Sequence, residues 1–171
     1  MFSLFFLFLL FFSCSSLEKE IDTKLNISSL TKAINQDPKN VDLFLKRVDF
    51  NLERSEFESA LFDLKQCLSI DSLDPYLHYK IAEVYFELSK QSYSHQRYAI
   101  LVRNHLNKSI ELDDKNYKSH ALLGEFYLAW YAVDSSAYQK AFFHLNNSLD
   151  LEYNQEEVHK NLGYFFHKYK P

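Results

Sequence analysis

The chain has 171 residues, a formal net charge of −4, and a composition that is 47% hydrophobic and 17% aromatic. This charge provides no general electrostatic attraction to nucleic acid or to anionic lipid. With only 2 Gly and 3 Pro a turn-rich all-β fold is disfavoured, and the length suits one domain with one sizeable core.

The first 12 residues are apolar apart from Ser3, and the chain becomes polar soon after Ser13 and Cys14. A helix of this length rises about 1.5 Å per residue, which is far short of the roughly 30 Å of bilayer hydrocarbon. The segment also lacks the polar face of a core helix. It therefore fits the short apolar region of a secretory signal.

The pair Ser13 and Cys14 resembles the end of a bacterial lipoprotein signal peptide, in which the cysteine becomes the lipidated first residue of the mature chain. The resemblance implies a signal peptide over residues 1–13, a short tether over 14–20, and lipidation at Cys14. It also implies a bacterial cell envelope location, with the lipid in the outer or inner membrane and the protein facing the periplasm. Phe11 and Phe12 are bulky for this pattern and no Lys or Arg precedes them, so an uncleaved anchor and an ordinary secretory signal stay open. A lipidated Cys14 would leave Cys67 without a disulfide partner in the monomer, and Cys67 is expected to be a small buried residue rather than a reactive thiol.

From residue 21 onward apolar residues recur at helical spacing, as in Leu61, Leu64 and Leu68. Asp74 followed by Pro75 marks a helix start, because a cap residue and a proline without a donor are both favoured there. The pattern predicts helices near 21–36, 41–54, 57–71, 75–92, 96–112, 117–132, 136–150 and 155–169.

Two series of residues repeat along the chain with the same intervals. The segments HYKIAEVYFEL (78–88), HALLGEFYLAW (120–130) and HKNLGYFFHKY (159–169) share a His, an aliphatic residue, a small residue and an aromatic, and FLKRVDFNLER (44–54) is a looser copy. Their central positions are spaced 34, 42 and 39 residues apart: Val48, Ala82, Gly124 and Gly163. A second series has the same spacings: Ala33, Cys67, Ser109 and Ser148.

These segments resemble the tetratricopeptide repeat, a unit of about 34 residues with a first and a second helix. The resemblance covers about residues 21–169 and implies a repeat domain over residues 21–171. The implied fold is all-α, a right-handed α-solenoid of about three full repeats with flanking half-repeats. It also implies a non-catalytic scaffold for protein–protein interaction. The longer intervals place insertions of 8 and 5 residues between the first and second helices of two repeats.

Small residues inside helices predict close helix contacts. Gly costs about 1 kcal/mol relative to Ala in a helix, so Gly124 and Gly163 are each expected to lie where a neighbouring helix needs the missing methyl group. His78, His120 and His159 occupy an aromatic register about one repeat apart, roughly 10 Å, so they are expected to pack between helices rather than share a metal ion.

The two insertions contain QSYSHQRY and AVDSSA. They are expected either to lengthen each helix by about a turn or to form a longer loop. A partner-binding rim carrying Tyr93, Arg97 and Tyr98 is the alternative, because exposed aromatic and Arg side chains are common interface anchors.

The family resemblance places the binding surface on the concave face lined by first helices. In each of the four first helices, one residue directly follows the small position: Asp49, Glu83, Glu125 and Tyr164. Tyr76, Tyr79 and Phe86 lie nearby on one of these helices, which predicts an acidic groove with an aromatic floor. We expect it to hold an extended segment of a partner protein, and a merely solvated acidic face stays open.

The sequence lacks a nucleophile elbow, a phosphate loop, an HExxH helix and paired metal-binding cysteines. It therefore predicts no enzyme activity, cofactor, metal or small-molecule substrate. The expected function is to assist assembly of an envelope complex as a membrane-anchored lipoprotein. An envelope enzyme or a carbohydrate-binding helical-repeat protein stays open as the alternative.

Overall fold

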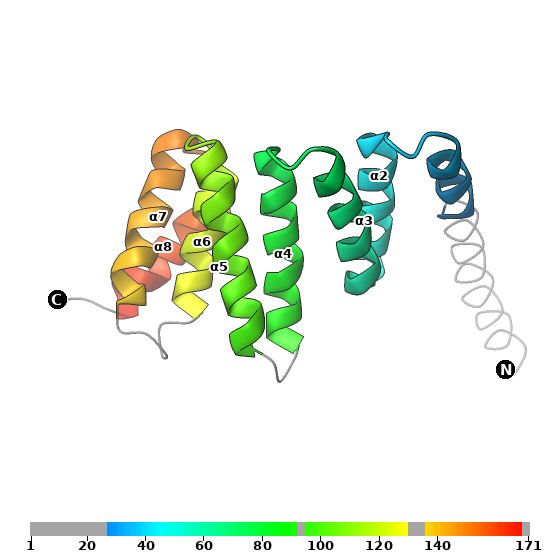
Figure 1. Cartoon of the computed structure of the whole chain (residues 1–171). Coiled ribbons are helices and arrows are strands. Elements are labelled where there is room, and N and C mark those ends of the chain that lie inside the picture. Colours follow the sequence, from blue (N-terminus) through cyan, green and yellow to red (C-terminus); the bar gives the residue numbers. More distant parts are fainter. Residues whose placement is uncertain (1–26, 92–94, 130–135, 169–171) are drawn as a thin grey trace, which may run out of the picture. The chain divides into compact units, whose positions relative to one another are not determined.

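The structure is a computed structural model that describes residues 27–91, 95–129 and 136–168 (Figure 1). Within these ranges the chain forms helices joined by turns and short loops, and no strand occurs. None of the helices described is both long enough and apolar enough to cross a bilayer.

A helix over residues 27–36 comes first and is followed by labelled helices: α2 (Val41–Glu53), α3 (Phe57–Ile70), α4 (Pro75–Gln91), α5 (His95–Leu112), α6 (Tyr117–Ala129), α7 (Ala137–Leu151) and α8 (Glu156–Lys168) (Figure 1). These bounds confirm the predicted helices to within about three residues wherever the structure describes them. The predicted helical residues 21–26, 92, 130–132 and 169 lie outside the described residues.

The chain divides into two compact units, Met1–Ile70 and Asp71–Pro171, and each is described by itself. In the first unit α2 packs against α3, with Val48, Ala60 and Leu64 fully buried. Cys67 is also fully buried, as expected. In the second unit α4 pairs with α5 and α6 with α7, while α5 contacts α6 and α7 contacts α8.

The second repeated series marks a contact between the two helices of each repeat. Ser109 on α5 donates a hydrogen bond to the carbonyl of Pro75, the first residue of α4, at 2.7 Å. Ser148 on α7 donates in the same way to Tyr117, the first residue of α6, at 2.8 Å. The Sγ of Cys67 lies 3.9 Å from the carbonyl of Val41, which begins α2. The repeated position therefore aligns the second helix with the start of the first.

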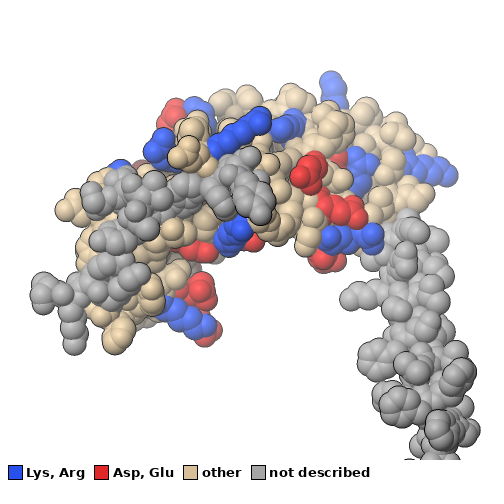
Figure 2. Space-filling model, turned by 90° about the horizontal axis from the view of Figure 1, so that it is seen from below, with Lys and Arg blue, Asp and Glu red and all other residues tan. Residues whose placement is uncertain are grey.

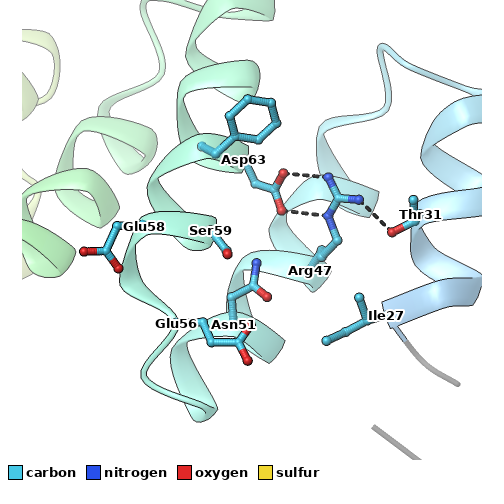
Figure 3. A pocket seen from close by; sticks show the side chains of 9 residues that line it. Ile27, Thr31, Arg47, Asn51, Glu56, Glu58, Ser59 and Asp63 are labelled. Atoms are coloured by element: carbon cyan, nitrogen blue, oxygen red, sulfur yellow. Dashed lines mark hydrogen bonds and ion pairs between the residues drawn. The ribbon is translucent and has the colours of Figure 1, made fainter. Parts of the chain in front are cut away.

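An ion pair joins the helices of the first unit. Arg47 on α2 donates through Nε and Nη2 to the two carboxylate oxygens of Asp63 on α3, at 2.8 and 2.7 Å (Figure 3). Its Nη1 donates to the hydroxyl of Thr31 at 2.8 Å. Asp63 is only 1% exposed, and its hydrogen bond is the main cause that raises the pKa of Arg47. This bidentate pair fixes helix 27–36, α2 and α3 around a buried charge.

The 8-residue insertion lengthens both helices of its repeat. α4 and α5 have 17 and 18 residues, whereas α2 and α3 have 13 and 14, so each gains four residues or about one turn. In the repeat with the 5-residue insertion α6 has 13 residues and α7 has 15. Residues 130–135, which contain the rest of this insertion, lie outside the described residues.

Gly124 confirms the predicted close contact, and Gly163 contradicts it. A Cβ atom on Gly124 would lie 2.6 Å from Cγ and 3.2 Å from the backbone nitrogen of Leu145, a fully buried residue of α7. A Cβ atom on Gly163 would meet nothing within 4 Å. The prediction for Gly163 is wrong because none of the described helices approaches this side of α8 closely enough to meet such an atom.

The two glycines form a matched pair of mutations. Gly124→Ala is expected to lower the free energy of unfolding by about 1–3 kcal/mol, because Leu145 and its backbone cannot both move away. Gly163→Ala is expected to raise it by roughly 0.5–1 kcal/mol through helix propensity alone. Thermal and urea unfolding of both variants measures the difference, and equal effects would show that the α6–α7 contact is not tight.

Candidate functional site

A pocket of about 360 Å³ lies in the second unit, between the helices that occupy the first position of successive repeats. Its lining comes from α4, α6, the residue before α8 and α8 itself: Tyr79, Glu83, Phe86, Glu87, Lys118, Ala121, Leu122, Glu125, Gln155, Glu156, Glu157, Val158 and Asn161. Five of these residues are glutamates, so the pocket is rich in carboxylate oxygens. This is the part of the second unit in which the sequence predicted a binding groove.

The structure brings together four of the predicted groove residues, because Tyr79, Glu83, Phe86 and Glu125 all line this pocket. Tyr76 lies beside them, with its ring centroid 6.2 Å from that of Tyr79.

The other two predicted groove residues lie elsewhere. Tyr164 is 57% exposed and is not part of the lining, because α8 faces the pocket with its first turns. Asp49 belongs to the first unit and lines a separate pocket with Lys46, Phe50 and Glu53. The pocket of the second unit therefore does not include Tyr164 or Asp49.

Both carboxylate oxygens of Glu83 are engaged. The hydroxyl of Tyr79 donates to Oε1 at 3.0 Å, and the ammonium of Lys80 donates to Oε2 at 2.7 Å. Burial and the nearby Glu83 carboxylate raise the pKa of Tyr79, so its hydroxyl stays protonated and remains a donor. Glu83 is thus held in one orientation by its own helix.

The carboxylate of Glu125 on α6 is less well compensated by nearby cations than that of Glu83. Burial is the main cause that raises the pKa of Glu125, and the neighbouring Glu87 and Glu157 raise it further. Lys90 opposes this effect, but its ammonium lies 3.8 Å from Glu125 and 2.7 Å from Glu87. One lysine therefore serves two carboxylates, and an additional cation at this place would stabilise the ionised form of Glu125.

The apolar part of the site is built on Phe86. Its ring packs edge-on against Phe126, with centroids 6.1 Å apart, and the Lys90 ammonium lies 4.3 Å from the Phe86 centroid. Phe86 lies where the sequence predicted an aromatic floor, but Phe86 and Phe126 are only 2% and 4% exposed and Lys90 covers part of the Phe86 ring. In Figure 2 acidic and basic side chains lie next to each other on the visible face, so no single sign of charge dominates that view.

The start of α8 supplies part of the pocket lining that was not expected from the sequence. Glu156 and Glu157 lie in its first turn and line the pocket with Asn161. The signal was present as two consecutive acidic residues at a helix start, which the helix dipole alone would favour.

The alternative rim is only partly described. Tyr98 is half-buried and stacks on Tyr85, with ring centroids 6.0 Å apart, while Arg97 is exposed. Tyr93 lies outside the described residues. Stacking of Tyr98 inside the helix pair favours the extended-helix interpretation of this insertion.

Two histidine pairs repeat at equivalent places, each with one buried and one half-buried ring, and only the buried member of each was expected from the sequence. The Nδ1 atoms of His78 and His105 are 3.1 Å apart, and those of His120 and His144 are 3.0 Å apart. The missed signal was the repeated text HLNKS and HLNNS at 105 and 144. In each pair one ring donates and the other accepts, so double protonation would break the bond.

His78 and His120 are buried between helices, as predicted, but His159 is exposed on α8 and that prediction is wrong. The cause is the one that applies to Gly163, since no second helix of its repeat covers α8 among the described residues. No group of three or more His, Cys, Asp or Glu side chains in the described part of the chain is arranged to hold a metal.

The Arg47–Asp63 pair lines a pocket of about 450 Å³ in the first unit (Figure 3). The lining also includes Phe62, which is 60% exposed. Three of the Arg47 nitrogens already donate to Asp63 and Thr31. This arginine is therefore committed to the fold and is poorly placed to hold an anion.

The described geometry defines an all-α helical-repeat solenoid of the tetratricopeptide type. Among solved structures, MamA superposes with a TM-score of 0.69 at 16% identity over 88% of this chain and 81% of its own. TTC0263, a thermophilic tetratricopeptide protein of Thermus thermophilus, gives 0.68 at 16% identity over 90% and 78%. The first tetratricopeptide domain of Spaghetti (RPAP3), bound to the HSP90 peptide SRMEEVD, gives 0.61 at 16% identity over 77% and 94%. At such identities the likeness shows the fold alone. No protein-family model matches the sequence, and no curated protein matches it either.

The His120–His144 pair predicts a loss of stability in acid. Burial and the neighbouring His120 lower the pKa of His144 to about 4, below the ordinary 6.5. The neutral His144 ring therefore makes its full contribution to the free energy of unfolding above pH 6.5, and this contribution is lost as the pH falls towards 4. The half-exposed ring reduces this contribution to on the order of 1–2 kcal/mol.

Urea unfolding between about pH 7 and pH 4 tests this prediction. His144→Gln should flatten the pH dependence across that interval, and His159→Gln on the exposed face of α8 is the matched histidine control. Parallel curves for wild type and His144→Gln would contradict the prediction.

Proposed function

We propose that the protein is a non-catalytic scaffold whose pocket between α4, α6 and α8 binds an extended, basic segment of a partner protein. The observation that carries the proposal is Glu125, a partly buried carboxylate beside Glu87 and Glu157 with one lysine shared between two of them. A Lys or Arg side chain from a partner would add the missing positive charge.

The neighbouring residues suit such a segment. Glu83 is already oriented by Tyr79 and Lys80, so little side-chain freedom would be lost on binding. Ala121 and Leu122 are half-buried in the lining and offer apolar area beside the carboxylates. The similar RPAP3 domain is described with the acidic peptide SRMEEVD, whereas the lining here holds five glutamates and one lysine, Lys118, so we expect it to favour a basic segment.

Fluorescence anisotropy with labelled extended peptides tests this proposal. One peptide carries Lys at two positions and its matched partner carries Glu there, with the same apolar residues. The full chain in detergent should bind the Lys peptide and not the Glu peptide. The double variant Glu83→Lys with Glu125→Lys should weaken binding at least about tenfold, which corresponds to about 1.4 kcal/mol. High salt should weaken wild-type binding because exposed charges are screened over about 8 Å at physiological ionic strength.

The control is Glu111→Lys with Asp150→Lys, which changes the net charge equally at exposed positions outside the pocket. Equal loss of binding in both double variants would show that the net charge of the protein, and not the pocket, determines peptide binding. Unchanged binding in the groove variant at both salt concentrations would place the binding site elsewhere, first at the Arg97 and Tyr98 rim.

We further propose that the protein is a bacterial envelope lipoprotein, acylated at Cys14, that assists assembly of an envelope complex. The support is the sequence alone: a short apolar N-terminus that ends at Ser13 and Cys14. The mature wild-type protein should have the mass of a polypeptide that starts at Cys14 and carries acyl groups. Two or more acyl chains should hold it stably on membranes. Cys14→Ser should abolish acylation and reduce membrane association. An unprocessed N-terminus, or equal membrane binding by Cys14→Ser, would refute lipidation, and mass spectrometry of proteins captured from native membranes would identify the partner.

A further inference from the structure

The helix α8 exposes the face that the other first helices of the second unit cover with a second helix. On α4 and α6 this face is formed by buried residues: His78, Ala82 and Tyr85, and His120, Gly124 and Tyr127. The residues at the same register on α8 are His159, Gly163 and Phe166. His159 is exposed, and a Cβ atom on Gly163 would meet nothing within 4 Å. Phe166 is 54% exposed although its ring packs edge-on against Phe142 of α7, with centroids 5.9 Å apart.

The helix over residues 27–36 has the complementary property. It carries Ala33 at the register of Cys67, so it is a second helix by sequence. Three residues back, the second helices α3, α5 and α7 place fully buried leucines: Leu64, Leu106 and Leu145. Leu30 is at this register and is only half-buried, as is Ala33. The face that would contact a first helix is therefore partly open among the described residues.

A pocket of about 360 Å³ lies beside this face, and Leu30, Asp49 and Phe50 are among its lining residues. Asp49 and Phe50 are at the registers of Glu125 and Phe126. In the second unit those two residues contact the preceding first helix, since Glu125 lies 3.8 Å from Lys90 and Phe126 packs on Phe86. The pocket is thus at the place that a preceding first helix would fill.

We propose that α8 of one copy packs against helix 27–36 of a second copy, so that the chain associates with itself head to tail. The occupant is a first-type helix, and the contact continues the helix pairing already seen in α4 with α5 and in α6 with α7. Gly163 would receive Leu30 of the other copy as Gly124 receives Leu145. The last turn of α8 contains the exposed His167, which would face the acidic Asp49 and Glu53 of the pocket.

The proposed interface joins two different surfaces of the same chain, so it is heterologous and can extend beyond two copies. This property separates it from a symmetric contact of two α8 helices. Mixing two variants, each changed at one end, distinguishes the two arrangements.

Cysteine cross-linking of the full chain in detergent micelles provides the test, with Cys14→Ser in every variant to remove that thiol. Leu30→Cys and Gly163→Cys are made separately with tags of different size and are then mixed under mild oxidation. A disulfide-linked mixed dimer, with at least about fivefold less homodimer in either variant alone, is expected for a heterologous contact. Leu73→Cys, at a residue that is 66% exposed and outside both faces, replaces Leu30→Cys in the matched control and should give only background.

Failure of the mixed dimer to exceed that control would overturn the proposal, as would a Gly163→Cys homodimer of equal yield. Ala33→Cys replaces Leu30→Cys if the latter unfolds, which circular dichroism reports. A second arm uses Gly163→Leu, which should not lower the helical content or the melting temperature, because its side chain meets open space in the single chain and Leu favours a helix more than Gly does. This variant should lose the concentration-dependent rise in mass that light scattering is expected to record for the unmutated chain, and retention of that rise would equally overturn the proposal.

Discussion

The alignment of each second helix on the start of its first helix is the constraint on which the rest of the repeat depends. Ser109 and Ser148 each donate to the first carbonyl of the paired helix, at 2.7 and 2.8 Å. Each hydroxyl also contacts the residues that lead into the next repeat, Asn116 at 3.3 Å and Gln155 at 3.0 Å. A single buried atom therefore sets the register inside one repeat and connects it to the next, and the close approach of Leu145 to Gly124 follows from that register.

Helix positions could be predicted from the sequence because the apolar stripes and the two repeated series agree on the same intervals. Gly163 and His159 were predicted wrongly for one physical reason. A repeat pattern predicts which residue type suits a position, but the residue is buried only if a neighbouring helix packs there. None of the described helices packs against α8 at Gly163 or buries His159. The same sequence position thus has different environments in α6 and α8.

The candidate site was predictable to the extent that it depends on helical register. Glu83 and Glu125 follow the small residue in successive first helices, and that spacing alone places them on one surface. The lysines that partly neutralise them were not anticipated, because such pairs depend on side-chain reach rather than on repeat spacing. The partners His105 and His144 were missed because they lie on second helices, where the family resemblance suggested no functional residues.

The 8-residue insertion shows where this architecture can change its length. Four residues enter each side of the α4–α5 hairpin at its tip, so the helices stay in phase and the aligned ends at Pro75 and Ser109 do not move. The added turns also bring buried surface of their own, since Leu88 and Ser89 are buried and Tyr98 stacks on Tyr85. A helical hairpin can thus accept whole additional turns at its tip, which lengthens both of its helices. The helix ends at the other side of the hairpin keep the spacing that joins one repeat to the next.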